Sequence, residues 1–403
     1  MKKYFPTLKT NKQNVYLDNA ATSLKIKSVI KSTIDYYKNF SLNPHSFSNN
    51  NFHFELKKNI DETRSFVSNW INCEYEEVIF TPSTTYSLNL LSLSFSQILN
   101  KKDSIFITKL EHSSNVYPWM SACKKTGSKL KYLLLNDDFT INENYIIKNV
   151  ENNTKIVSFS HISNNLGVIN DVKKITKLIK EKNPNCFVII DVCQSIAHEK
   201  IDVKDWGIDA LVFSAHKLYG PTGIGVLWVK KDSEKKIPHL LWGGGKDQSP
   251  LEIIDKNSEN SLTYSKFEVG TLPLSQLFGL REVFIFLNNL DWSKQLIKEK
   301  NLRNYAVKRL SEIKNIVIYN KDFSSSIILF NILNFHSHDV SNYLAKNNIF
   351  VRGGSFCSPF LKELIGVSSA TRVSLAIYND KSDIDKLVNC LKLLNEKEIS
   401  LLF

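Results

Sequence analysis

The stretch that decides the fold is ALVFSAHKLYGPTG, residues 210–223. It opens with an apolar run, closes that run with Ser-Ala-His-Lys, and then turns through Gly220 and Pro221. A short apolar run that stops at Gly/Pro signals predicts a buried strand. Lys217 then stands just past the strand end, where two interpretations remain open. It is either a surface lysine at a turn or an amine in a partly desolvated site, as a Schiff base with a carbonyl cofactor requires.

A second apolar run, VIIDVCQ at residues 188–194, carries Asp191 at its carboxyl end. In open α/β sheets the ligand crevice lies at the carboxyl ends of the strands. Taken alone, Asp191 is as well explained as a helix N-cap. Beside the strand of Lys217, it is the expected partner of a protonated pyridine nitrogen, because a buried anion keeps such a ring charged and able to withdraw electrons.

Outward from these two runs, short apolar strands alternate with helical stretches. Leu56, Ile60 and Val67 share one helical face, and residues 85–99 form a further predicted helix. The predicted strands cover residues 78–80, 104–108, 129–135, 155–159, 186–190 and 209–213. This alternation predicts an α/β fold, a mainly parallel sheet with helices on both faces.

The second half of the chain predicts a smaller α+β domain. Residues 243–265 are rich in Gly, Ser, Asn and Lys and predict a long loop. Helices at 273–289, at 292–313 and from 381 frame strands at 316–319, 326–333 and 349–352. We therefore divide the chain into an N-terminal segment (1–15), a large domain (16–270), a connecting helix (271–290) and a C-terminal domain (291–403).

Composition excludes several classes of protein. The 403 residues are 42% hydrophobic and 23% charged, which excludes disordered and fibrous chains. The net charge of +12 comes from 52 basic and 40 acidic residues, but only six of the basic residues are arginines. Lysines in blocks no longer than two predict a solvated surface, and we expect no nucleic-acid partner.

The termini, apolar runs and cysteines also limit the possibilities. No signal peptide follows Met1, and no apolar run reaches the roughly 18 residues of a membrane span, so we expect a cytoplasmic protein without a membrane partner. Six scattered cysteines form no C-x-x-C pair, which argues against a metal site or a disulfide framework. Five are expected to be small core residues. Cys357 follows Gly353-Gly354, whose backbone freedom we expect to let a reactive thiolate move.

Beyond these features, the chain resembles the fold-type-I pyridoxal-phosphate enzymes of the class V aminotransferase family. Within that family it is similar to the SUF-type cysteine desulfurase and selenocysteine lyase group. The resemblance runs from about residue 16 to 378. It is carried by YLDNAA (16–21), Thr84-Thr85, EHSSN (111–115), SHISNNLG (160–167), Asp191-x-x-Gln194, SAHK (214–217), FEVGT (267–271), RGGSFC (352–357) and TRVSLAIYN (371–379).

The resemblance implies a large pyridoxal-phosphate domain, a smaller C-terminal domain and a set of cofactor residues. Lys217 would form the Schiff base with pyridoxal 5'-phosphate and carry the substrate's α-proton. Asp191 would pair with the pyridine nitrogen, Gln194 would bond the phenolic oxygen, and His112 would stack on the ring and serve as acid or base. The phosphate would be held by the residues Thr84, Thr85, Ser214, His216 and, from across a homodimer interface, Thr271.

The resemblance also implies the substrate site and the reaction. Arg372, whose planar fork suits a carboxylate, would bind the α-carboxylate of L-cysteine with help from Asn164. His45, near the site entrance, and Arg352 would also bind the substrate. Cys357 would take the substrate sulfur as a persulfide, release L-alanine, and pass the sulfur to an iron–sulfur scaffold or a sulfur-shuttle protein.

Three alternatives remain open at this point. Selenocysteine lyase would use the same residues, whereas an aminotransferase or epimerase on this fold would not need Cys357. The third is a basic nucleic-acid-binding protein that has kept the fold. The chain also departs from the family pattern at Ser83, Phe356 and Ser358. The β-carbon of Ser83, where the family usually has glycine, is expected to narrow the phosphate seat.

Overall fold

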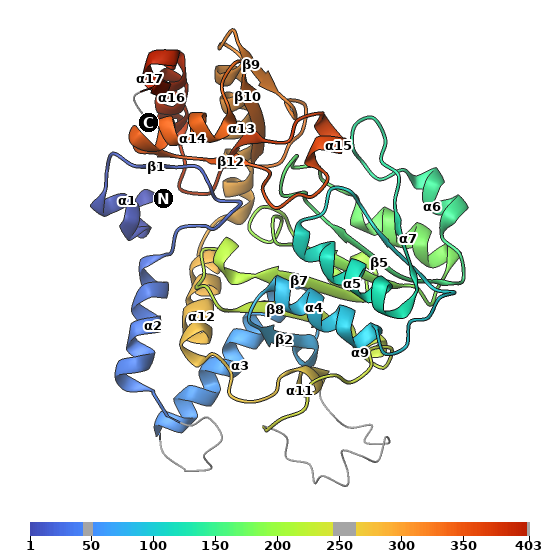
Figure 1. Ribbon diagram of the computed structural model, residues 1–403. Helices are drawn as coiled ribbons and strands as arrows, with labels where there is room; N and C mark the ends of the chain where they lie inside the picture. Colours follow the sequence, from blue (N-terminus) through green and yellow to red (C-terminus); the bar gives the residue numbers. More distant parts are fainter. Residues whose placement is uncertain (43–50, 245–262, 401–403) are drawn as a thin grey trace.

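The computed structural model describes residues 1–42, 51–244 and 263–400, and a seven-stranded sheet forms its centre (Figure 1). The strand order is β2-β8-β7-β6-β5-β3-β4. The strands are β2 (Val78–Thr81), β3 (Ser104–Ile107), β4 (Lys129–Tyr132), β5 (Thr154–Ser160), β6 (Phe187–Asp191), β7 (Ala210–Ser214) and β8 (Gly225–Val229). Four of the six neighbouring strand pairs are parallel, which confirms the mainly parallel sheet. The strand β8 was not predicted, and it runs antiparallel between β2 and β7.

Side chains alternate along the strands of the large sheet and so contribute to two hydrophobic cores, one on each face. Phe80, Val188 and Phe213 pack on one face of the sheet with α3, α7 and α12. Ile79, Ile189 and Val212 pack on the other face with α4 and α5. The helices around the sheet are α3 (Asn51–Ile71), α4 (Thr84–Phe95), α5 (Tyr117–Thr126), α6 (Glu143–Asn149), α7 (Val172–Lys182), α8 (Val203–Trp206), α9 (Lys231–Glu234), α11 (Thr263–Phe267) and α12 (Leu274–Asn288). The strands are therefore apolar on both faces, as a sheet covered by helices on both sides requires.

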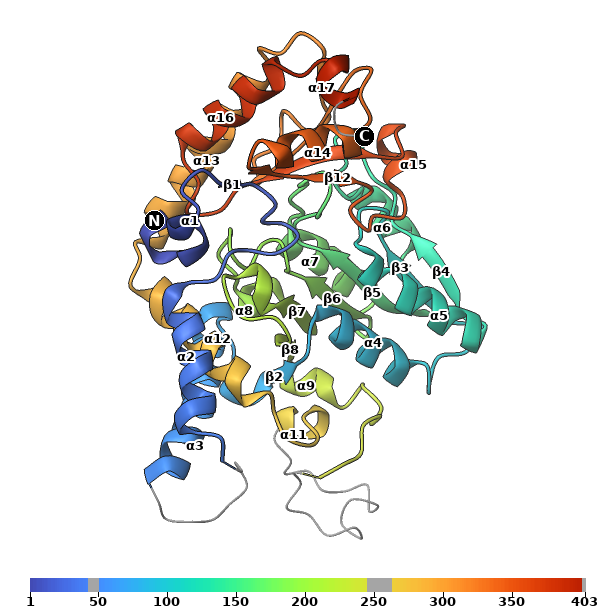
Figure 2. The ribbon, with the colours of Figure 1, turned by 60° about the vertical axis from the view of Figure 1, so that its left-hand side comes forward.

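The C-terminal part of the chain folds around a small antiparallel sheet of order β12-β13-β10-β9. Figures 1 and 2 show this part, orange to red, above the large sheet. Its elements are α13 (Trp292–Leu310), β9 (Ile316–Ile318), β10 (Ile327–Ile332), α14 (Ser337–Lys346), β12 (Arg352–Gly354), α15 (Leu361–Ile365), β13 (Ala370–Ser374), α16 (Lys381–Lys392) and α17 (Glu396–Ser400). The predicted strand 349–352 is wrong as one element. It divides into β11 (Ile349–Phe350), which pairs with β1 (Val15–Tyr16), and β12, which pairs with β13.

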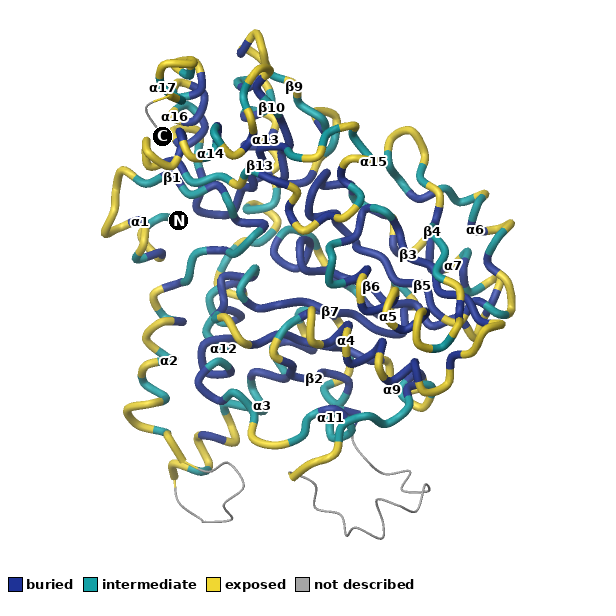
Figure 3. Tube along the Cα trace, viewed as in Figure 1, coloured by how far each residue is buried: buried dark blue, intermediate teal, exposed yellow. Residues whose placement is uncertain are grey.

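The N-terminal segment packs with both parts of the molecule. Phe5 and Leu8, around α1 (Pro6–Thr10), join the main core, whereas Val15 and Leu17 join the C-terminal core. The next helix, α2 (Lys27–Asn39), lies against α12 and buries only Val29 fully, so its outer face is exposed (Figure 3). The domain limits at residues 16, 271 and 291 stay predictions.

Three further predictions, on a loop, on the cysteines and on membrane spans, can be compared with the structure. The predicted loop 243–265 is wrong at its end, because α11 begins at Thr263, and residues 245–262 lie outside the described part. Cys123, Cys186 and Cys193 are buried as expected, but Cys73 and Cys390 are only half-buried. Within the described ranges, no helix is both long and apolar enough to cross a bilayer.

Candidate active site

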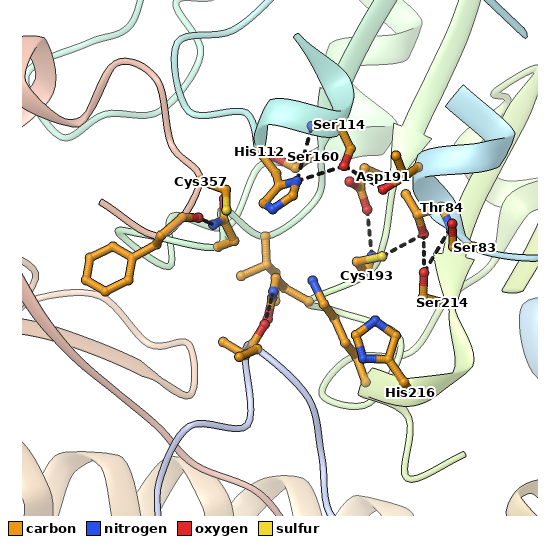
Figure 4. Close-up of a pocket in the computed structure, with 18 of the residues that line it drawn as sticks. Ser83, Thr84, His112, Ser114, Ser160, Asp191, Cys193, Ser214, His216 and Cys357 are labelled. Atoms are coloured by element: carbon orange, nitrogen blue, oxygen red, sulfur yellow. Dashed lines mark hydrogen bonds between the residues drawn. The ribbon is translucent and has the colours of Figure 1, made fainter. Parts of the chain in front are cut away.

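A cavity of about 200 Å³ lies where the carboxyl ends of the large-sheet strands face the C-terminal part. Asp191 ends a strand of the large sheet, and Lys217 and Thr84 come shortly after strand ends. Arg352, Cys357 and Arg372 come from the C-terminal part. Figure 4 shows the polar side chains converging on this space. Of the predicted site residues, the cavity is lined by Thr84, Thr85, His112, Asn164, Asp191, Gln194, Ser214, His216, Lys217, Arg352, Cys357 and Arg372.

The segment that carries Lys217 is held by the N-terminal loop. Lys217 ends a single 3-10 turn (Ala215–Lys217) that follows β7 directly. The carbonyl oxygen of His216 accepts bonds from the Ser23 N–H at 2.9 Å, the Ser23 hydroxyl at 3.0 Å and the Lys25 ammonium at 2.9 Å. Burial lowers the pKa of Lys25 to about 8. The peptide bond just before Lys217 is therefore fixed by residues almost two hundred positions away.

Asp191 is a buried carboxylate that faces the cavity without an ion-pair partner among the described residues. Burial raises its pKa, and the Cys193 N–H, which donates to Oδ1 at 2.8 Å, opposes that shift. Asp191 ends β6 and does not cap a helix, so the N-cap interpretation is wrong. Gln194, on the same turn, donates from Nε2 to the carbonyl of Ala20 at 2.9 Å.

Small hydroxyls gather where α4 begins. The N–H of Thr84 donates to Ser214 Oγ at 2.9 Å, and the Thr84 hydroxyl lies 2.8 Å from Cys193 Sγ. Ser83 lies in extended backbone (φ −175°) and caps α4 by accepting the Tyr86 N–H at 3.2 Å. A helix N-terminus surrounded by hydroxyl groups is a suitable seat for a phosphate. Ser83 is therefore the N-cap residue of α4 and also lines the cavity.

The neighbours of His112 fix its protonation state. The backbone N–H of Ser114 donates to Nδ1 at 3.2 Å, so Nδ1 is an acceptor and the ring proton lies on Nε2. Burial, with help from the charge of Lys217, lowers the pKa of His112 to about 4. The Ser114 hydroxyl lies 3.0 Å from the same nitrogen and 2.7 Å from the Thr85 hydroxyl. His112 is therefore a neutral ring that offers Nε2–H, a form that suits stacking and hydrogen-bond donation better than acid–base exchange.

Arg372 is buried and lines the cavity. One terminal nitrogen donates to the Asn164 carbonyl at 2.7 Å and the other to Asp18 Oδ1 at 3.1 Å. Arg372 Nε and Asn164 Oδ1 are buried without a hydrogen-bond partner. Arg352 lies directly opposite Arg372 across the β12–β13 pair. Two adjacent guanidinium groups and an unpaired N–H give this end of the cavity the charge and the donor that a small carboxylate requires.

The loop that carries Cys357 is exposed at the cysteine and held on both sides. The Cys357 carbonyl accepts bonds from the N–H and the hydroxyl of Ser113, and Asn164 Nδ2 donates to the Phe356 carbonyl at 2.9 Å. Asn165 Nδ2 donates to Ser358 Oγ at 2.5 Å. The preceding pair Gly353-Gly354 lies in β12, so the expectation that these glycines free the loop is wrong. The residues that hold the loop all come from the large-sheet half of the molecule.

One predicted site residue lies away from the cavity. Thr271 is exposed and does not line the cavity of its own chain. His45 lies outside the described residues. Sequence reasoning also missed functional neighbours, namely Asp18, Ser113, Ser114 and Cys193. Asp18, Ser113 and Ser114 lie inside quoted motifs, and Cys193 lies between Asp191 and Gln194, but their contacts depend on loops that meet only in the folded chain.

The comparisons with known proteins agree with this geometry. Residues 15–387 match the family described as Aminotransferase class-V. Because that match spans most of the chain, the protein belongs to the class V aminotransferase family.

Particular relatives narrow this class further. The chain is 38% identical over 392 residues to a protein named "Probable cysteine desulfurase" from Ureaplasma parvum, covering 97% of this chain and 96% of the relative. A solved structure of an apo cysteine desulfurase from Thermococcus onnurineus aligns with TM-score 0.88 and 28% identity, covering 97% of this chain and 96% of that one. A cysteine desulfurase structure from Escherichia coli aligns with TM-score 0.87 and 28% identity, covering 100% and 98%.

Proposed function

We propose that this protein is a cysteine desulfurase that converts L-cysteine to L-alanine and keeps the sulfur as a persulfide on Cys357. One observation carries the proposal. A single cavity joins an amine (Lys217), a buried carboxylate (Asp191), a carboxylate-binding end (Arg372) and an exposed thiol (Cys357). An aminotransferase or epimerase would need the first three groups but has no use for the thiol.

The residues present fit pyridoxal 5'-phosphate. Asp191 is a buried carboxyl group, and burial raises its pKa. A protonated pyridine nitrogen beside it would stabilise its charged form. Thr84, Thr85, Ser214 and His216 would hold the phosphate at the start of α4. Lys217 would attach the cofactor covalently, His112 would stack on its ring, and Gln194 would bond its phenolic oxygen. When bound, the cofactor withdraws electrons from the substrate's α-carbon.

The chain's own residues bind the substrate and move its proton. Arg372, with its unpaired Nε, and Asn164 would fix the α-carboxylate of L-cysteine, and Arg352 would add positive charge at the entrance. With the substrate fixed, the amine of Lys217 would take the α-proton and return it. His112 would donate a hydrogen bond from Nε2 as a neutral ring.

The sulfur step belongs to Cys357. Its thiolate attacks the substrate sulfur, an S–S bond forms, and the Cβ–S bond breaks with its electron pair left on the carbon side. The transferred sulfur is oxidised as the β-carbon is reduced, so L-cysteine plus the thiol gives L-alanine plus the persulfide with no external oxidant. Cys357 is exposed, which would let an iron–sulfur scaffold or a sulfur-shuttle protein collect the sulfur.

The proposal includes a cytoplasmic homodimer. Tyr86 and Leu93 on α4 and Tyr117 and Met120 on α5 are large apolar side chains that are 39–56% exposed on two helices in contact. An apolar surface of this kind beside a site is typical of a subunit interface. In such a dimer the partner subunit's Thr271 would complete the phosphate seat.

The test is an assay of the cofactor-loaded enzyme on L-cysteine, measuring alanine and, with a thiol reductant, sulfide. We expect equal amounts of both products from the wild type. Cys357→Ala should lose at least about a hundredfold in rate while it keeps the visible absorbance of the bound cofactor, since the nucleophile alone is removed. Lys217→Ala should lose both. A preference for selenocysteine that survives Cys357→Ala would instead favour a selenocysteine lyase.

A further inference from the structure

One residue of the large-sheet half of the molecule holds the backbone of Cys357. Ser113 donates both its backbone N–H and its hydroxyl to the carbonyl oxygen of Cys357, each at 2.8 Å. Ser113 opens the 3-10 turn Ser113–Asn115, directly after His112. The contact joins residues 244 positions apart. Figure 4 shows Cys357 on the same side of the cavity as His112.

The loop needs such a restraint because its backbone is strained. Phe356 (φ 59°) and Cys357 (φ 54°) both adopt the left-handed conformation, which side chains other than Gly, Asn and Asp avoid. Phe356 is buried, its ring lies 4.9 Å from the Arg372 guanidinium carbon, and its carbonyl accepts from Asn164. Phe356 is thus fixed by packing. Cys357 is exposed, and Ser113 supplies the described hydrogen bonds to its carbonyl.

We propose that Ser113 is a positioning residue for sulfur transfer, whose two hydrogen bonds hold Cys357 in the left-handed conformation that keeps its thiol at the cavity. This inference rests on the proposed function. The chemistry before sulfur transfer does not involve Cys357, so Ser113 acts on one step only. Its hydroxyl supplies half of the restraint and can be removed without changing the backbone donor.

The test compares Ser113→Ala with Ser113→Thr, which keeps a hydroxyl. Ser311→Ala is the matched control, because Ser311 also donates its hydroxyl to a backbone carbonyl, that of Val307, on the exposed end of α13. Three rates are measured on the cofactor-loaded enzymes. They are alanine formation from L-cysteine, exchange of the α-proton of L-alanine with solvent deuterium, and alkylation of Cys357 by iodoacetamide without substrate.

For Ser113→Ala we expect alanine formation to fall about tenfold, as the loss of one hydrogen bond on a strained loop implies. Proton exchange should stay within about twofold, since the cofactor residues are unchanged. The rate of Cys357 alkylation should change by a factor of about three or more, because a loop without this restraint presents the thiol differently. Ser113→Thr should restore all three rates, and Ser311→Ala should alter none.

The inference is overturned if Ser113→Ala leaves alanine formation unchanged, or if it slows proton exchange as much as sulfur transfer. A wild type that forms no alanine would contradict the proposed function instead. The alkylation rates would then still decide the position of Cys357, because they need no turnover. Equal alkylation of wild type and Ser113→Ala would overturn the inference in either case.

Discussion

The guanidinium group of Arg372 donates hydrogen bonds to two different residues. Its terminal nitrogens donate to Asn164 and Asp18, and Nε is buried without a hydrogen-bond partner. A lysine would offer one ammonium group on a flexible stem and could not keep these directions together. Position 372 therefore requires an arginine, although most basic residues of this chain are lysines.

Arg372→Lys should raise the KM for L-cysteine by about ten- to a hundredfold, with a smaller change in kcat, because the substrate carboxylate would lose the Nε–H donor and the oriented guanidinium charge. Steady-state kinetics on the cofactor-loaded enzyme measure this. Arg309→Lys, at a surface arginine paired with Asp385, is the control and should have no effect. An unchanged KM in Arg372→Lys would place the carboxylate elsewhere.

Sequence motifs identified Arg372 but not its environment. Asp18 lies 354 residues earlier, inside a motif that gave no reason to link it to an arginine. The tautomer of His112 likewise depends on a backbone N–H, that of Ser114. Residue types and strand ends could therefore be predicted, whereas the hydrogen-bond partners that set protonation and orientation could not.

At the scale of elements, the Gly353-Gly354 pair shows why two adjacent glycines did not indicate a mobile loop. A β-carbon at Gly353 would lie 2.4 Å from the carbonyl oxygen of Ser337, at the start of α14. The glycine is needed so that β12 can pass this helix closely, not so that a loop can move. This contact could not be predicted, because the sequence does not indicate which helix passes close to β12.

A second inter-element contact links the two halves of the molecule. His198, which follows β6, lies 2.5 Å from Glu299 on α13, and both side chains are buried or nearly so. Burial opposes the charged form of His198, but the Glu299 carboxylate outweighs this and raises the pKa above its ordinary value. The stabilisation from a raised histidine pKa is complete below the unfolded-state value, near 6.5, and is lost as the pH rises through the folded-state value.

We expect the wild type to be more thermostable than His198→Gln at pH 6, by about 2 °C or more, and this advantage to shrink by pH 9. Melting curves across this range measure the difference. Glu299→Gln should flatten the same pH dependence, since it removes the other partner. If His198→Gln keeps the pH profile of the wild type, the pair does not contribute in this way.

At the scale of the whole molecule, the fold could be predicted from the alternation of apolar strands and helices, because most strands of the large sheet are buried on both faces. What could not be predicted were β8 and the division between β11 and β12, since short apolar runs carry no sign of the sheet they join. Thr271 is the clearest open case. It is absent from its own cavity and has a role only if a second subunit brings it there.

Mixing two inactive variants tests that role. In a dimer that shares its sites, chains with Lys217→Ala and chains with Thr271→Ala would together form one fully wild-type site per mixed dimer. We expect cofactor affinity and desulfuration to recover after the two are unfolded and refolded together. Recovery should be absent when either variant is refolded alone. If the mixture gains nothing, Thr271 does not act across the interface.

The most direct measurement is the mass of the protein itself. The cofactor-loaded enzyme is incubated with L-cysteine without reductant and then digested under conditions that trap persulfides. We predict one added sulfur atom on the peptide that contains Cys357, lost again on reduction and absent in Cys357→Ala. Alanine formed while Cys357 stays unmodified, or sulfur found only on the half-buried Cys73 or Cys390, would contradict the proposed function.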